Sequence, residues 1–203
     1  MLVGYEANTA LRHSGKLGDY GRTLISQLAS RHVADYRALL FASRIKKSLR
    51  QFHTGYANVS TYLPSGSAKL FPELWMRYQI EPWLKAEKVA LFHALNEEIP
   101  YNINPTIKTI LTCHGLGSHH ATSAADLLFW RRRIRYSLRV ANAVVVESEE
   151  ARQGLAAEGV NPDKIVVIGG PNPLELTPQM VEQYYMLYCK LDTLGSSDPS
   201  IEP

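Results

Sequence analysis

The chain has 203 residues and a formal net charge of +3, from 22 basic and 19 acidic side chains. Hydrophobic residues make up 45% of it, which excludes wholesale disorder and suits one globular domain. Two cysteines, Cys113 and Cys189, cannot form a disulfide framework or a zinc ribbon. No run reaches the roughly 18 apolar residues of a membrane span. The first residues do not form a signal peptide, so we expect a cytoplasmic protein.

Seven mostly apolar segments are typical of strands, and helical patterns separate them. The strand segments are nearly continuous rather than alternating, as in a parallel sheet buried on both faces. We expect strands at 2–5, 36–41, 58–62 (the weakest), 89–93, 106–113, 143–147 and 164–168. This alternation predicts an α/β fold: a single Rossmann-like, doubly wound, mainly parallel sheet of six to seven strands with helices on both faces.

The expected helices have recognisable ends. We predict helices over 19–31, with Asp19 as the N-cap, over 126–141, and over 148–158, with Ser148 as the cap and Gly159 as the stop. After a domain over 1–168, residues 169–176 resemble a turn-rich linker. A docking helix follows over 177–192, capped by Thr177, and a flexible tail over 193–203. The apolar stripe of this helix comprises Val181, Tyr184, Tyr185, Tyr188 and Leu191.

Ligands of open α/β sheets bind beyond the carboxyl ends of the strands, so the loops that follow strands are the candidate sites. The loop over 7–18 is long and holds Gly15, Lys16, Leu17 and Gly18 before a helix. Its glycines allow backbone N–H groups to approach a phosphate or a sugar hydroxyl. A flexible loop without a ligand is the alternative interpretation.

Two other loops carry polar candidates. His114 follows the strand over 106–113 and is a candidate to hydrogen-bond a substrate, although a purely structural histidine remains the alternative. Asn96 and Glu97 follow the strand over 89–93, where a solvated loop is equally compatible. No metal-ligand spacing surrounds the histidines, so we expect no metal. The chain also lacks a P-loop and the G-x-S-x-G elbow of a hydrolase that would use His114.

Five arginines lie within nine residues, and Arg131, Arg135 and Arg139 recur at helical spacing to form a basic patch. Without these five charges the chain would carry −2, so general nucleic-acid binding is not indicated. A solvated helix face is the simpler interpretation of the patch. A weak contact with acidic lipid, or with an acidic or phosphate-bearing partner, is the alternative.

Five segments in order resemble motifs of the retaining glycosyltransferases of family four, which have the GT-B fold. The segment from Gly15 to Arg22 resembles "G-x-G-x-Y-x-R", and the segment that ends at His114 resembles "T-x-H-D". The others lie at 91–94, 139–149 and 162–168. Residue 115 is glycine where the family has aspartate.

The resemblance implies roles for several residues. Residues 1–168 would form the acceptor-side lobe, with Gly15–Gly18 and Arg22 near the donor phosphates. His114 would be the catalytic residue that contacts the transferred sugar, and Asn96 and Glu97 would face the acceptor. The lobe that binds the nucleotide-sugar has no counterpart after residue 168, while residues 180–191 resemble the family's returning helix. Either an excised piece or a natural deletion would explain this.

We therefore expect the acceptor-binding half of a nucleotide-sugar-dependent glycosyltransferase, inactive alone and without a cofactor of its own. Its expected partners are a sugar acceptor, a separate nucleotide-binding lobe, and a second copy bound through the exposed interlobe face. The alternative is a non-catalytic or engineered single-domain scaffold or binding module derived from such a lobe. An unrelated hydrolase is disfavoured by the missing serine elbow.

Overall fold

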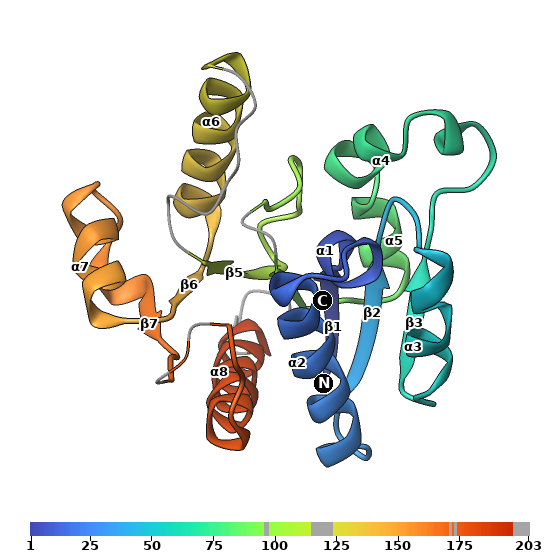
Figure 1. Ribbon diagram of the computed structural model, residues 1–203, viewed down its shortest axis with the longest axis horizontal. Coiled ribbons are helices and arrows are strands. Elements are labelled where there is room, and N and C mark those ends of the chain that lie inside the picture. The colour runs from blue at the N-terminus through green and yellow to red at the C-terminus, as the bar shows by residue number, and fades with distance from the viewer. Residues whose placement is uncertain (96–97, 115–123, 171, 173, 197–203) are drawn as a thin grey trace, which may run out of the picture.

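The computed structural model describes residues 1–95, 98–114, 124–170, 172 and 174–196. Its seven strands form one sheet in the order β3-β2-β1-β4-β5-β6-β7, and every neighbouring pair is parallel. The predicted Rossmann-like architecture is therefore confirmed (Figure 1). The strands are β1 (Leu2–Glu6), β2 (Arg37–Phe41), β3 (Val59–Tyr62), β4 (Leu91–Ala94), β5 (Lys108–Cys113), β6 (Ala143–Val146) and β7 (Ile165–Val167).

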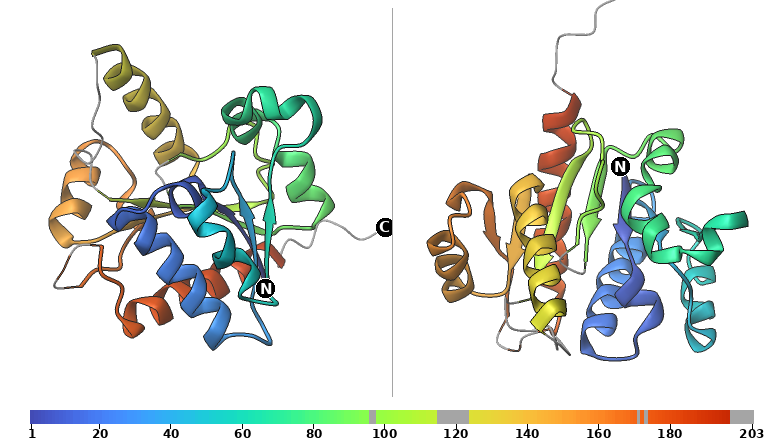
Figure 2. Two further views of the ribbon diagram at one scale, coloured as in Figure 1. Left: turned by 45° about the vertical axis from the view of Figure 1, so that its right-hand side comes forward. Right: turned by 90° about the horizontal axis from the view of Figure 1, so that it is seen from above.

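Helices cover both faces of the sheet (Figure 2). They are α1 (Asn8–Arg12), α2 (Lys16–Arg31), α3 (Arg50–Thr54), α4 (Pro72–Tyr78), α5 (Glu81–Ala86), α6 (Ala124–Val140), α7 (Glu149–Ala157) and α8 (Pro178–Ser196). Three short 3₁₀ turns complete the described elements: Lys47–Leu49, Gly66–Leu70 and Pro162–Lys164.

Two predictions about helix entries are wrong. The segment over 7–18 is not one open loop, because it contains α1. Asp19 does not cap α2: the helix begins three residues earlier, Gly15 occupies the N-cap position, and Asp19 lies in the first turn. The predicted Ser148 cap is confirmed, since its hydroxyl accepts a hydrogen bond from the backbone N–H of Ala151. Gly159 has the positive φ of 89° that the end of this helix requires.

Side chains alternate along each strand and so build two separate cores. On one face, residues such as Tyr5 and Val145 pack beneath α2 and α8. On the other, residues such as Phe92 and Val146 pack beneath α4, α5, α6 and α7. Burial on both faces explains the continuous apolar runs that identify these strands in the sequence.

Helix α8 lies beside α2 on the first face, as both views of the molecule show (Figures 1 and 2). Its side chains Val181, Tyr184 and Tyr188 are fully buried, and Leu191 is 8% exposed. Tyr185 is half-buried and stacks on His32, with ring centroids 3.5 Å apart. The helix thus contributes several large side chains to the core at the end of the described chain.

Beneath α8 lies a chain of buried polar groups that we call the tyrosine network. It is defined by Tyr5, Tyr20, Tyr36, His93, Thr112, Tyr184 and Tyr188. At its centre, both ring nitrogens of His93 are hydrogen-bonded, Nδ1 to the Tyr188 hydroxyl and Nε2 to the Thr112 hydroxyl, at 2.7 Å each. Burial, with a smaller effect of His114, lowers the pKa of His93 to about 3, so the ring is neutral.

The carboxyl ends of all seven strands meet at one edge of the sheet, because every pair is parallel. The strand order reverses between β1 and β4, which makes this the topological switch point. Open α/β sheets bind their ligands in the crevice at such a point. The residues that follow β1, β2, β4, β5 and β6 are therefore the ones to inspect for a site.

Candidate functional site

At the switch point, β1 ends in a buried carboxyl group. Glu6 is 4% exposed, and its Oε1 accepts a hydrogen bond from the backbone N–H of Asn8 at 2.9 Å. Among the described residues its Oε2 has no hydrogen-bond partner. The pKa of Glu6 is raised to about 8, mainly by burial and to a smaller extent by the nearby carboxylates of Glu98 and Glu73, against the lowering effect of the Asn8 hydrogen bonds. Glu6 is therefore mainly protonated at neutral pH.

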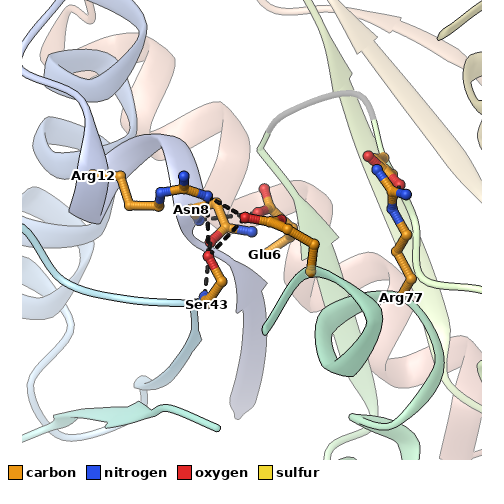
Figure 3. A network of polar contacts seen from close by, with 7 residues as sticks. Glu6, Asn8, Arg12, Ser43 and Arg77 are labelled. Carbon is orange, nitrogen blue, oxygen red and sulfur yellow. Dashed lines mark hydrogen bonds and ion pairs between the residues drawn. The ribbon is translucent and has the colours of Figure 1, made fainter. Parts of the chain in front are cut away.

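Polar side chains from α1, α4 and the segment after β2 surround Glu6, and Figure 3 shows them converging. The Asn8 Oδ1 accepts hydrogen bonds from both the backbone N–H and the hydroxyl of Ser43, each at 2.8 Å. Arg12 donates to the Ser43 hydroxyl at 3.0 Å and to Glu73 at 2.5 Å. These contacts fix the side of the site that lies next to β2.

A second ion pair closes the other side. Arg77 Nε lies 2.7 Å from Glu98 Oε1, and in Figure 3 Arg77 and Arg12 stand on opposite sides of the group. A pocket of about 110 Å³ opens between the two pairs. It is lined by Glu6, Asn8, Thr9, Arg12, His13, Glu73, Met76, Arg77, Glu98 and Pro100. We call it the Glu6 pocket; it offers hydrogen-bond donors and acceptors on both walls.

Farther along the same edge, His114 lies next to Glu147. The sheet register pairs Cys113 with Val146, so the residues that follow them are neighbours. His114 Nδ1 lies 2.7 Å from Glu147 Oε1, and the imidazole packs edge-on against Tyr20 at a centroid distance of 4.9 Å. Its side chain is only 4% exposed. A carboxylate at this distance fixes the orientation of an imidazole ring.

Gly169 packs against the backbone of Glu147, one member of this pair. A β-carbon at this position would lie 1.7 Å from the carbonyl oxygen of Glu147. Only glycine allows the chain after β7 to pass so close to the end of β6. The first residue of the predicted linker is therefore part of the scaffold that holds the His114–Glu147 pair.

The predicted glycine loop forms the start of α2. Gly15 is exposed and has an extended φ of −97°, and a β-carbon there would meet nothing within 4 Å, so neither space nor backbone requires glycine. Gly18 is different, because a β-carbon would lie 2.3 Å from the carbonyl oxygen of His13. Lys16 is exposed and Leu17 is half-buried. Among the described residues no side chain caps this helix, which leaves its first N–H groups without a side-chain acceptor there.

Arg22 is engaged with its own neighbourhood. Its guanidinium donates to the carbonyl oxygens of Ala10 and His13 and to the Asp19 carboxylate, and its side chain is 12% exposed. The residue thus ties α1 to α2. The place near the donor phosphates that the resemblance implies for Arg22 stays a prediction.

The basic patch lies elsewhere. Arg135 and Arg139 are exposed on α6 and, with Lys164, border a groove of about 610 Å³ between α6 and α7. Because α6 runs from the carboxyl end of β5 to the start of β6, this groove is at the opposite edge of the sheet from His114. The side chain of Arg131, like Asn96 and Glu97, lies outside the described residues.

Sequence reasoning named the segment over 7–18 as a candidate site but singled out none of the residues that line the Glu6 pocket. One signal was available: Glu6 is a charged residue directly after the apolar run of the first strand. The same signal exists for Glu147, the first residue after β6. The pocket's other members come from α1, α4 and two loops, and no spacing in the sequence connects them.

The described part of the chain has neither a metal-binding cluster nor a helix that could span a membrane. No group of three or more histidine, cysteine, aspartate or glutamate side chains there could hold a metal ion. None of the helices described is both long and apolar enough to cross a bilayer.

Solved structures with a similar fold include an epimerase and a galactosyltransferase. UDP-N-acetylglucosamine 2-epimerase from Rickettsia bellii superimposes with a TM-score of 0.53 at 12% identity, over 96% of this chain and 51% of the epimerase chain. The apo lipopolysaccharide outer core galactosyltransferase WaaB gives a TM-score of 0.51 at 13% identity, over 85% of this chain and 46% of its own. The chain thus spans about half the length of these structures. At these identities the similarity shows the fold alone.

The family is identified by comparison of the sequence rather than of the fold. No curated protein matches it significantly. The model of Glycosyltransferase Family 4, in contrast, matches residues 20–175, which is more than half of the chain. This match runs from the first turns of α2 to the segment after β7, and so includes His114, Glu147 and Gly169. The chain therefore belongs to glycosyltransferase family 4, and its single Rossmann-like domain is of the GT-B type.

Proposed function

We infer that this chain is the acceptor-binding lobe of a retaining glycosyltransferase, which transfers a sugar only together with a separate lobe that binds the nucleotide-sugar. The observation that carries the proposal is that the carboxyl edge offers groups suited to an acceptor and a sugar, but few cations for a diphosphate. That edge has a pocket rich in paired polar groups, the Glu6 pocket, and a histidine held by a carboxylate. Such groups suit an acceptor and a transferred sugar.

Transfer from a nucleotide-sugar requires positive groups that stabilise the departing diphosphate. Three arginines near this edge already have partners: Arg12 pairs with Glu73, Arg77 pairs with Glu98, and Arg22 donates to two carbonyl oxygens and Asp19. The open start of α2, with Lys16, adds only one helix N-terminus. These contacts support the expectation that the second lobe supplies the cations for the diphosphate.

In this proposal His114 contacts the transferred sugar, and Glu147 keeps its ring in position. The two residues lie on the family-matched segment and are within hydrogen-bond distance of each other. Tyr20, which packs on His114, also hydrogen-bonds to Tyr184 on α8 at 2.7 Å. The returning helix thus supports the histidine through one intermediate side chain.

The test is a titration of the full chain with a panel of UDP- and GDP-sugars, followed by amide NMR shifts and by released nucleotide. We expect no release from the chain alone. Release should begin when the nucleotide-binding lobe of a two-lobed family member is added, and His114→Ala in this chain should abolish it. Arg135→Ser, at the opposite edge of the sheet, is the matched control and should leave release unchanged.

Two results would contradict the proposal in different ways. Micromolar binding with turnover by the chain alone would mean that one lobe holds a complete donor site. Sugar binding at the carboxyl edge that never becomes turnover, with any added lobe, would identify the chain as the non-catalytic binding module.

A further inference from the structure

The Glu6 pocket contains an unused hydrogen-bonding atom in a place where such atoms are rare. The carboxyl group of Glu6 is 4% exposed, and its Oε2 has no hydrogen-bond partner among the described residues. A buried polar atom without a partner costs roughly 1–3 kcal/mol, so nearly all such atoms in folded proteins are paired. An exception that lines a pocket indicates a ligand that completes the pairing.

The geometry also assigns the proton within the group. Oε1 accepts the backbone N–H of Asn8, which requires a lone pair on that oxygen. In a protonated acid the carbonyl oxygen is the stronger acceptor, so the hydrogen bond from Asn8 favours Oε1 as the carbonyl oxygen. The hydrogen is then carried by Oε2, which has no partner among the described residues. At neutral pH the raised pKa of Glu6, about 8, keeps the acid in this form. The pocket consequently presents an O–H donor rather than a carboxylate.

Both arginines that line the pocket are already paired with carboxylates, and Arg133 of α6 lies 3.8 Å from the other oxygen of Glu98. Arg12 pairs with Glu73 and Arg77 pairs with Glu98, on opposite walls (Figure 3). A ligand that carries a phosphate or a carboxylate would have to break one of these pairs to gain an arginine. A neutral ligand with several hydroxyl groups can instead donate to the carboxylates and accept from the arginines while both pairs persist.

The size of the pocket limits what enters. About 110 Å³ is well below the roughly 300 Å³ of a typical small-molecule site, so only one edge of a ligand fits. The hydroxyl-bearing edge of a single sugar ring has this size and this chemistry.

We propose that the Glu6 pocket binds the hydroxyl edge of an uncharged sugar ring, with Glu6 Oε2 donating one hydrogen bond and Arg12 and Arg77 contacting neighbouring hydroxyls. This inference rests on the proposed function, in which that ring is the terminal sugar of the acceptor. The part of the acceptor that this pocket recognises would therefore be a neutral sugar. The resemblance implies acceptor contacts only in the loop after β4, at Asn96 and Glu97. This proposal adds contacts in the crevice between β1 and β4.

The test uses methyl α-glucoside, methyl α-galactoside and N-acetylglucosamine as neutral probes, and glucose 6-phosphate and glucuronate as charged ones. Each is titrated into the full ¹⁵N-labelled chain while the amides of Glu6, Asn8, Arg12, Ser43 and Arg77 are followed. We expect at least one neutral probe to shift these amides, and the charged probes to bind at least tenfold more weakly there.

Variants of Glu6 separate a donated hydrogen bond from simple proximity. When the pH rises from 7 to 9.5, wild-type affinity for the neutral probe should fall roughly three- to tenfold, the value of one hydrogen bond. Glu6→Gln keeps an acceptor for Asn8 and a donor for the ligand, so its affinity should not change with pH. Glu6→Leu removes the donor and should bind weakly at every pH. These variants leave unchanged the other titratable and charged groups that line the pocket, which are Arg12, His13, Glu73, Arg77 and Glu98. They also leave unchanged Arg133 of α6, which lies 3.8 Å from Glu98.

Opposite results overturn the inference. Wild-type affinity that rises with pH would make Glu6 an acceptor, and tighter binding of the charged probes would mean that the ion pairs open. A neutral probe that shifts only amides near His114 would refute this pocket while it leaves the proposed function intact. Conversely, a pocket that binds sugar in a chain that no nucleotide-binding lobe activates would refute the proposed function and support the pocket.

Discussion

Two polar regions of this molecule each contain deeply buried groups, yet they differ in how completely these groups are paired. In the tyrosine network every ring nitrogen of His93 has a partner, and α8 covers the whole chain of hydroxyls. In the Glu6 pocket the central carboxyl keeps one oxygen without a partner among the described residues. Buried polar groups therefore have two uses in this molecule. Those of the tyrosine network position α8, whereas Glu6 leaves one oxygen for a ligand.

The largest expected effect comes from removing the cover of the tyrosine network. A chain that ends at Gly170 lacks α8 and its buried Met180, Val181, Tyr184, Tyr188 and Leu191. Each such side chain contributes roughly 1.5–3 kcal/mol, so together they approach the whole stability of a domain. We expect aggregation and no cooperative thermal transition by circular dichroism. A chain that ends at Ser196 is the control, and an unchanged melting curve for the shorter chain would refute the structural role of α8.

The next effect concerns pH and Glu6. The folded protein binds the Glu6 proton more tightly than the unfolded chain, because burial raises the pKa from 4.5 to about 8. This contribution is therefore complete below about pH 4.5 and is lost as the pH rises to 8, by at most about 1.4 kcal/mol per pH unit. Urea unfolding of wild type and Glu6→Gln at pH 5 to 8 measures it. The stability difference between the two should grow in favour of the variant, and a constant difference would exclude a buried acid.

The contribution of His93 to folding stability depends on pH in the opposite direction to that of Glu6. Its lowered pKa means that the unfolded chain binds the proton more tightly, so this contribution is complete above about pH 6.5 and is lost toward pH 3. Glu6→Gln leaves that acid limb unchanged. Only the neutral-to-basic part of the stability profile should respond to the variant.

Within the tyrosine network, loss of one hydroxyl should have a moderate effect. Tyr188→Phe removes the partner of His93 Nδ1 at 2.7 Å and of the Tyr5 hydroxyl at 3.2 Å. Because both partners stay buried, the free energy of unfolding should fall by about 1–3 kcal/mol. Tyr185→Phe, on the half-buried side of the same helix, should cost less than about 0.5 kcal/mol. Equal losses for the two variants would show that the network adds nothing beyond packing.

The smallest effect is expected in the wall of the Glu6 pocket. Ser43→Ala deletes the hydroxyl that donates to Asn8 and accepts from Arg12. The backbone N–H of Ser43 still donates to Asn8 at 2.8 Å, so the free energy of unfolding should fall by only about 0.5–1.5 kcal/mol. Chemical denaturation at pH 7 checks this. A loss as large as that of Tyr188→Phe would mean that the two regions are equally dependent on complete pairing.

The sheet was predictable because burial on both faces leaves a strong signal in the sequence. Runs such as 143–147 contain almost nothing but apolar residues, and β6 indeed covers Ala143–Val146. The short helices α1, α4 and α5 span five to seven residues, too few for a helical period to be recognised. The general rules for parallel sheets predict right-handed crossovers, but the strand order came only from the structure.

The candidate site was predictable only where adjacent strands determine it. His114 was identified as the residue after β5, and the register of β5 and β6 places Glu147 beside it. The Glu6 pocket depends on α4 folding over the edge of the sheet, which no local pattern indicates. For Arg22 the motif suggests a role near the donor phosphates, which stays a prediction. The structure adds contacts that no motif indicates, from its guanidinium to two carbonyl oxygens and to Asp19.

The contact between Tyr5 and Tyr188 also has a consequence for how the chain folds. The two hydroxyls are hydrogen-bonded across 183 residues of sequence. At a synthesis rate of roughly 5–20 residues per second, Tyr5 waits on the order of 10 to 40 s for its partner. During that interval the apolar sheet face that α8 will cover stays exposed to solvent and prone to aggregation. Folding in the cell should therefore depend on chaperones that shield this face, and closure of so large a loop should be the last and slowest folding step.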